Sequence, residues 1–172
     1  MKAKELTPTQ SYYIVKDLLK SKRTFRDEDF KPGKLLFYFY NAKDKENTYD
    51  RTPMVLILKR NSTHTLGLNF HWIPVKMRIH LISVIFKLNK QNIIKKLPLE
   101  FSYQQLKPMM RKLGYAPCIR LYINKRISTN GVIIPADRLV EVAGLKTETF
   151  THGKYSAEQM YAMARKRSLK KN

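Results

Sequence analysis

Three short apolar runs in the first half of the chain have the length and composition of β-strands. They cover residues 35–40, 54–58 and 65–70, and each is rich in leucine, isoleucine, valine or aromatic side chains. Short polar segments separate them, and this spacing is typical of an antiparallel meander. Three strands packed so closely predict a small SH3-like β-barrel or a bent antiparallel sheet.

Helical patterns flank these strands. Capping boxes, in which a hydroxyl residue is followed three positions later by glutamine, begin at Thr7, Ser102 and Ser156. The spacing of apolar residues predicts a further helix over residues 74–88, and a short helix should follow Pro135. The predicted class is therefore α+β, in which helices decorate the sheet and both an N-terminal helix and a basic C-terminal helix are added to it.

Two more strands are predicted in the second half of the chain, at residues 118–123 and 132–134. Asn130-Gly131 lies between them and is a strong signal for a hairpin turn. Nearer the N-terminus, residues 21–29 mix charges of both signs without periodicity. That pattern favours a surface linker between the first helix and the strands.

The chain has 172 residues, which is long enough for one domain with a hydrophobic core and too short for two comfortable ones. Hydrophobic residues make up 43% of it, far above the content of a disordered chain. We therefore expect an N-terminal helix and charged linker, one β-rich core domain with helices, and a basic C-terminal helix or arm, in residues 1–30, 31–150 and 151–172 respectively.

Charge points to a polyanionic partner. Lys and Arg number 34 against 13 Asp and Glu, a formal net charge of +21, and such an excess repels itself unless a polyanion balances it. Nucleic acid is the commonest partner of this kind, with an acidic protein surface and an anionic membrane as alternatives. We expect a soluble protein without a membrane partner, because no signal peptide and no run of about 20 apolar residues is visible.

Basic pairs interleaved with aromatic and amide residues mark the candidate binding surface. Lys and Arg bind phosphate oxygens without sequence preference, and exposed aromatic rings can stack on bases. The partner would be DNA bound independently of sequence, or acidic surfaces of other proteins. The candidate residues are Lys95, Lys96, Arg111, Lys112, Lys125, Arg126, Arg165, Lys166, Arg167, Lys170 and Lys171.

No metal or cofactor site is predicted. Cys118 is the single cysteine, which excludes a disulfide framework, a multi-cysteine zinc site and an iron–sulfur cluster. The four histidines lack the spacing of helical metal ligands. No cluster of carboxylates suited to Mg²⁺ occurs, and no glycine-rich phosphate loop or dinucleotide fingerprint is present. The sequence therefore predicts a non-enzymatic protein.

Asp50 and His71 remain the residues with the most chemical interest. If the meander is right, both lie at neighbouring strand ends, within reach of each other as a catalytic dyad. The structural alternative is that Asp50 caps an Asx-type turn or pairs with Arg51 or Arg78. We expect the structural role, because hydrolysis of phosphodiesters usually needs two or three carboxylates around Mg²⁺.

A series of residues along the chain carries a family resemblance. It consists of Tyr49, Asp50, Arg51 and Pro53; Gly67, Asn69, His71, Pro74 and Arg78; Pro117, Cys118, Ile119 and Tyr122; and Thr147, Glu148 and Phe150. Over residues 31–150 the chain resembles a family of small proteins from large tailed bacteriophages with contractile tails. Family members have Tyr at the position of Trp72, and most lack the first thirty residues. The resemblance implies a phage origin, with the shared residues as determinants of fold and surface and not as a catalytic set.

These observations rank three functions. A structural component of the virion comes first, in the neck, baseplate or head, contacting DNA or an acidic virion partner; this role would also allow oligomers within the particle. An intracellular DNA-binding or replication accessory protein comes second, and a small nuclease third. The expected location is accordingly the virion or the host cytoplasm.

Overall fold

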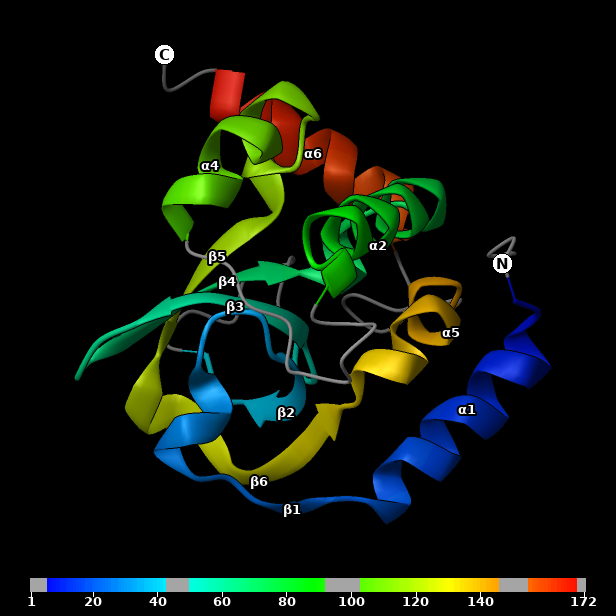
Figure 1. Ribbon diagram of the computed structural model, residues 1–172, viewed down its shortest axis with the longest axis vertical. Coiled ribbons are helices and arrows are strands. Elements are labelled where there is room, and N and C mark those ends of the chain that lie inside the picture. The colour runs from blue at the N-terminus through cyan, green and yellow to red at the C-terminus, as the bar shows by residue number, and fades with distance from the viewer. Residues whose placement is uncertain (1–5, 43–49, 92–102, 146–154, 170–172) are drawn as a thin grey trace.

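The computed structural model describes residues 6–42, 50–91, 103–145 and 155–169 (Figure 1). Its centre is a six-stranded antiparallel sheet in the order β1-β6-β2-β3-β4-β5. The strands are β1 (Arg23–Thr24), β2 (Leu35–Tyr40), β3 (Met54–Arg60), β4 (His64–Asn69), β5 (Ile119–Ile123) and β6 (Ile127–Ile134). The α-helices are α1 (Pro8–Lys20), α2 (Val75–Leu88), α4 (Tyr103–Lys112), α5 (Leu139–Ala143) and α6 (Ala157–Leu169). The α+β class is confirmed.

The sheet is bent but open. Among the described strands, β1 and β5 form its two edges, and no ladder joins β5 to β6. Tyr38 and Tyr40 of β2 nevertheless lie against Tyr122 of β5, with ring centroids 5.9 and 5.0 Å apart. Because β3 and β4 separate these strands in the sheet, the contacts require strong curvature. Of the two forms predicted, the bent antiparallel sheet is confirmed, and the closed SH3-like barrel is not formed.

The predicted hairpin turn at Asn130-Gly131 is wrong. Both residues lie inside β6 and pair with β1, and the chain passes from β5 to β6 through the 3-10 turn η4 (Asn124–Arg126). Glycine is required within this strand because a Cβ there would collide with the ring of Phe25 and lie 2.6 Å from the carbonyl oxygen of Phe37. A glycine in a strand often marks such a close approach of another part of the chain.

The charged segment expected to be a linker is instead built into the sheet. It contributes β1 and the 3-10 turn η1 (Asp27–Phe30). The buried Asp29 accepts hydrogen bonds from the Arg23 guanidinium and the Arg26 backbone N–H, both at 2.7 Å. Burial opposes ionisation of Asp29, but these hydrogen bonds outweigh it and hold its pKa below the usual value. The mixed charges therefore form an ion-paired turn that leads into β2.

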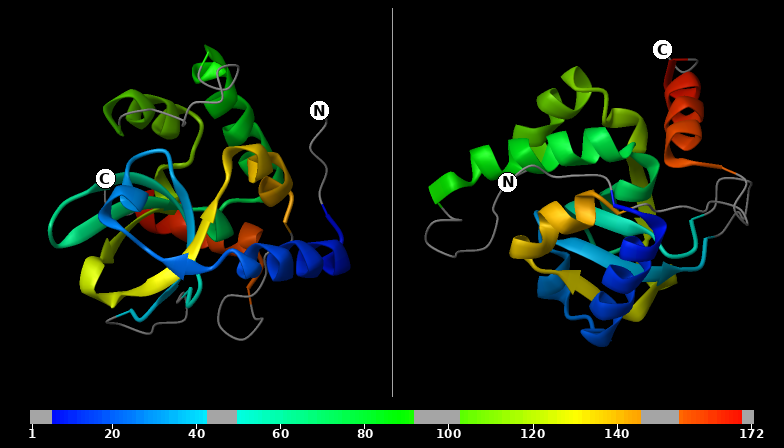
Figure 2. Two further views of the ribbon diagram at one scale, coloured as in Figure 1. Left: turned by 60° about the horizontal axis from the view of Figure 1, so that its bottom comes forward. Right: turned by 90° about the vertical axis from the view of Figure 1, so that its right-hand side faces the viewer.

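The helices gather around the sheet and share its core (Figures 1 and 2). Leu81 of α2, Met110 of α4 and Met160 of α6 are fully buried in the same hydrophobic cluster as Leu56 and Leu68 of the central strands. Helix α1 adds Leu18 to this cluster and lies beside β6. None of the described helices is both long and apolar enough to cross a bilayer.

Local signals for the helix ends are largely confirmed. Helix α1 begins with the predicted capping box: Thr7 Oγ1 accepts from the Gln10 N–H at 3.2 Å, and Gln10 Oε1 accepts from the Thr7 N–H at 2.9 Å. Helix α6 begins with the same exchange between Ser156 and Gln159. Gly114 follows α4 with a φ of 79°, the left-handed conformation expected of it. The capping residue expected before α4 lies outside the described residues.

Candidate nucleic-acid interface

Five of the basic residues predicted to bind a polyanion lie exposed on two helices. They are Arg111 and Lys112 in the last turn of α4, and Arg165, Lys166 and Arg167 on α6. The Tyr161 hydroxyl of α6 donates to the carbonyl oxygen of Gly114, just after α4, at 2.9 Å. This bond fixes both helices at the same end of the molecule, the top of Figure 1. Four further candidates, Lys95, Lys96, Lys170 and Lys171, lie outside the described residues.

Negative charge is scarce on the side of the molecule formed by α2, α4 and α6, which we call the helical side. Helices α2 and α4 contain no acidic residue, and α6 contains only Glu158. Within the described parts of the chain, none of the five basic residues above forms an ion pair. The helix dipole favours cations at a C-terminus by only about 0.3–1 kcal/mol. It does not compensate such a concentration of like charge, so an external polyanion is the better explanation.

A second basic group lies where edge strand β5 turns into β6. Lys125 of η4 is exposed, and the Arg126 guanidinium donates from Nη1 to the carbonyl oxygen of Asn41 at 3.2 Å. These residues, together with Phe39 and Ser128, line an open groove of about 460 Å³. Strand β5 connects this groove to the α4 end of the molecule. Basic groups therefore lie at both ends of β5, and the strand itself carries Arg120.

Phe39 gives this groove an aromatic wall. It is 40% exposed, although it lies in a strand with buried neighbours. The register of β2 against β6 shifts between Tyr38 and Tyr40, and the Phe39 N–H donates to Ser128 Oγ at 3.2 Å. Tyr38 pairs with Gly131 and Tyr40 with Ile127, so the extra residues of this irregularity lie in β6, and Phe39 keeps the regular alternation of β2. The Arg51 guanidinium lies 5.0 Å from the Phe39 ring centroid, and aromatic rings combined with cations are what single nucleic-acid bases stack on.

Asp50, Asn69 and His71 meet at the corner that follows β4. Asp50 Oδ2 accepts from Asn69 Nδ2 at 2.9 Å and lies 3.0 Å from His71 Nδ1. Asp50 Oδ1 accepts from the Thr52 N–H at 3.2 Å, which is an Asx-type turn, and Asn69 Oδ1 accepts from the His71 N–H at 2.9 Å. The side chains of Asp50 and His71 are only 11% and 12% exposed. The carboxylate thus joins the chain before β3 to the end of β4.

This corner has the contacts of a structural cluster. The described residues contain no group of three histidine, cysteine or carboxylate side chains that could hold a metal ion. Arg78, one of the suggested partners of Asp50, is buried and donates to the carbonyl oxygens of Ile73 and Leu145 at 2.8 and 2.9 Å. The geometry therefore brings Asp50 and His71 together, as expected, and within the described residues it adds no further carboxylate of the kind that a nuclease would use for Mg²⁺.

The other residues of the phage-like series lie mainly at turns and close contacts. Pro53 is buried before β3, Pro74 caps α2, and a Cβ on Gly67 would collide with the side chain of Val55. Pro117 lies in the 3-10 turn η3 (Ala116–Cys118). Tyr49, and with it Thr147, Glu148 and Phe150, lie outside the described residues.

Cys118 is fully buried, and its Sγ donates to the carbonyl oxygen of Trp72 at 3.3 Å. Burial raises the pKa of the Cys118 thiol to about 12. The thiolate is the reactive form of cysteine. At neutral pH this side chain therefore remains a protonated part of the core, and the structure offers no role for it as a nucleophile.

Replacing Asp50 by asparagine should lower the melting temperature. The change removes the charge from three contacts, and hydrogen bonds to charged groups contribute about 1.5–3 kcal/mol each when measured singly. Because the amide can keep part of the network, we expect a loss of about 2 kcal/mol in the free energy of unfolding, measured by calorimetry. Asp137→Asn, at an exposed acid in η5 (Ala136–Arg138), is the control and should change little. Loss of a nuclease activity at unchanged melting temperature would contradict the structural role.

The chain is similar to a known protein family. A family model described as phage T4 terminal DNA protecting protein matches residues 4–164. The match contains α1, all six strands and the first part of α6, and so extends beyond the 31–150 resemblance at both ends. The match therefore includes the N-terminal helix, which lies outside the residues that carry the resemblance. Comparison with curated proteins and with solved structures finds no match.

Proposed function

The chain belongs to the phage T4 terminal DNA protecting protein family, and we propose on this premise that it binds the ends of linear phage DNA and shields them from exonucleases. The family match carries the proposal, because it covers 4–164, almost the whole chain. The predicted resemblance to a phage protein family is confirmed by the same match. Protection would take place wherever a free DNA end exists, in the host cytoplasm or in the virion.

The charge distribution supports this proposal physically. Duplex DNA carries one negative charge per about 1.7 Å of its axis, and cations that neutralise phosphates release its condensed counterions. The exposed cations of α4 and α6 would contact the duplex backbone, and the Phe39 groove at η4 would face the terminal base pair. A terminal pair differs from an internal one in having a free π-face, on which an aromatic ring with its cation can stack.

The family match changes the order of the functions that the sequence favours. The sequence alone favours a structural role in the neck, baseplate or head, but the family match supports the second alternative, an intracellular DNA-binding protein, better. Binding to DNA ends requires no place in the wall of a particle and no acidic protein partner. Protection also requires no catalysis, so we propose that the protein acts by occupying the end.

An exonuclease assay tests this function. Linear duplex DNA, preincubated with the protein, is treated with an exonuclease that degrades only from double-stranded ends, and the surviving full-length DNA is measured over time. We expect survival to rise steeply when the protein reaches a few molecules per end. The same total DNA mass in longer molecules has fewer ends and should need proportionately less protein.

Two results of this assay would overturn the proposal. One is degradation at an unchanged rate under saturating protein. The other is protection that scales with the mass of DNA instead of the number of ends, because that dependence indicates coating of the whole duplex. An endonuclease that cuts inside the duplex is the control, and its rate should be unaffected at the protein level that protects ends.

A further inference from the structure

Arg60, at the end of β3, has an unfilled hydrogen-bonding position. Its guanidinium carbon lies 3.7 Å from the centroid of the Phe30 ring, so the side chain is held by stacking. Its Nη1 is buried and has no hydrogen-bond partner among the described residues. Buried donors are rarely left unpaired, and each exception calls for a physical explanation. Because Nη1 is shielded from solvent, an anion in the neighbouring groove would supply a partner only after a neighbouring group moves aside.

The groove beside Arg60 is open and basic. It has a volume of about 510 Å³, and its lining includes Lys31 and Lys59 with the polar residues Asn61 and Ser62. Asn124 of η4 lines it as well, while the next two residues of η4 line the Phe39 groove. Both grooves therefore border η4.

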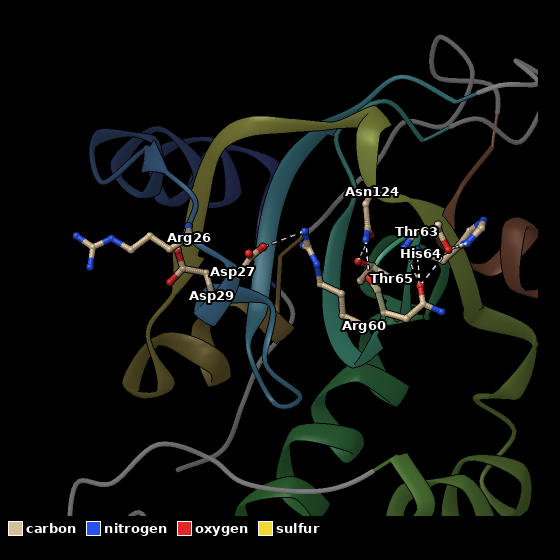
Figure 3. A network of polar contacts seen from close by, with 9 residues as sticks. Arg26, Asp27, Asp29, Arg60, Thr63, His64, Thr65 and Asn124 are labelled. Atoms are coloured by element: carbon tan, nitrogen blue, oxygen red, sulfur yellow. Dashed lines mark hydrogen bonds and ion pairs between the residues drawn. The ribbon is translucent and has the colours of Figure 1, made fainter.

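Asp27 is the one acidic side chain among the residues that line this groove. Its Oδ1 lies 3.5 Å from Nη2 of Arg60, and the carboxylate is fully exposed (Figure 3). Charged hydrogen bonds are usually about 2.7–2.9 Å long, so this contact is loose. The neighbouring acids are already paired, Glu28 with Arg26 at 3.4 Å and Asp29 with Arg23. The groove therefore has more positive than negative charge, and this excess favours the binding of a second anion near Arg60.

We propose that this groove binds a phosphate group of DNA, with Arg60 as the principal ligand, and that the phosphate displaces the loosely held Asp27 carboxylate. A guanidinium presents two parallel N–H groups to phosphate oxygens, and stacking on Phe30 fixes its plane before the ligand arrives. Resting on the proposed function, we assign the phosphate to the 5′ end of the duplex. A terminal monoester carries about −1.5 to −2 charges, more than an internal diester, and suits a groove with three cations.

The test uses one short duplex in three forms: blunt with 5′-phosphates, blunt with 5′-hydroxyls, and closed at both ends by hairpin loops. Affinities are measured by fluorescence anisotropy at fixed salt. We expect the phosphorylated duplex to bind about tenfold more tightly than the hydroxyl form, a difference that one charged hydrogen bond can supply. Arg60→Gln should abolish the difference, and Asp27→Asn should enlarge it. Lys16→Gln, at an exposed cation of α1, removes the same charge elsewhere and should preserve it.

The outcomes separate this inference from the proposed function. If the wild-type protein binds both blunt forms equally and Arg60→Gln weakens both, the phosphate site stands and its ligand is an internal phosphate. If Arg60→Gln folds and binds all three forms like wild type, the inference is overturned. If the hairpin-closed and blunt duplexes bind equally well, the proposed binding to DNA ends is overturned, but the phosphate site is not. Should Arg60→Gln fail to fold, Asp27→Asn decides, because an unchanged affinity in that variant overturns the inference.

Discussion

Replacing Arg165, Lys166 and Arg167 together by glutamine should reduce the slope of log K against log salt for duplex DNA by about 2 to 3 units. Each neutralised phosphate contributes about 0.9 units of slope, and all three side chains are exposed on α6 without a paired carboxylate in the described structure. At low salt, where the electrostatic contribution is largest, the affinity should fall by orders of magnitude. Titrations of a random duplex at several salt concentrations measure both quantities.

Substitution is the appropriate experiment because α6 also belongs to the core. Met160 and Ala164 are buried in the main hydrophobic cluster, so deleting the helix would open the core as well as remove charge. The control is the replacement of Lys16, Lys20 and Lys22 by glutamine, which removes three exposed cations from the opposite end of the chain. An equal loss of slope in both triple variants would contradict a DNA surface on α6, since it would show that only the net charge matters.

Gly131→Ala should destabilise the protein by about 2–3 kcal/mol, the cost of forcing extra volume into a packed site. The new Cβ would collide with the Phe25 ring and the Phe37 carbonyl oxygen, and the latter is backbone of a central strand and cannot rotate away. Urea unfolding measures the loss. Asn130→Ala, at the exposed neighbour, should cost well under half as much, because it removes only the exposed hydrogen bond with Thr24. A neutral Gly131→Ala variant would contradict the described packing of β1 on β6.

The same glycine shows where sequence patterns reach their limit. Asn-Gly is a turn signal because both residues tolerate positive φ, and that argument uses only neighbouring residues. What decides the conformation of Gly131 is Phe25, more than a hundred positions away in the chain. By contrast, the capping boxes of α1 and α6 and the ending of α4 at Gly114 depend on contacts within one helical turn. These local signals therefore predict the helix ends correctly.

The residues of the candidate interface also differ in whether the sequence alone predicts them. Exposed cations on α4, α6 and η4 could be predicted from charge, because long basic side chains are seldom buried. Phe39 and Arg60 could not. Phe39 is exposed near the end of β2, opposite the irregular part of β6, and the guanidinium of Arg60 is held by stacking on Phe30 of η1. Both features depend on which distant parts of the chain meet, and composition does not specify that.

The uneven placement of carboxylates in the described structure has a consequence for how the protein reaches its target. The acids of α1, α5 and η1 all lie in ion pairs with neighbouring cations, while α2, α4 and α6 carry cations with only Glu158 among them. On these three helices the positive charge is therefore left largely uncompensated. In the field of a DNA rod we expect the molecule to rotate during its approach, so that the helical side arrives first. Encounters would then be faster than random tumbling allows, and salt would slow them by screening the torque.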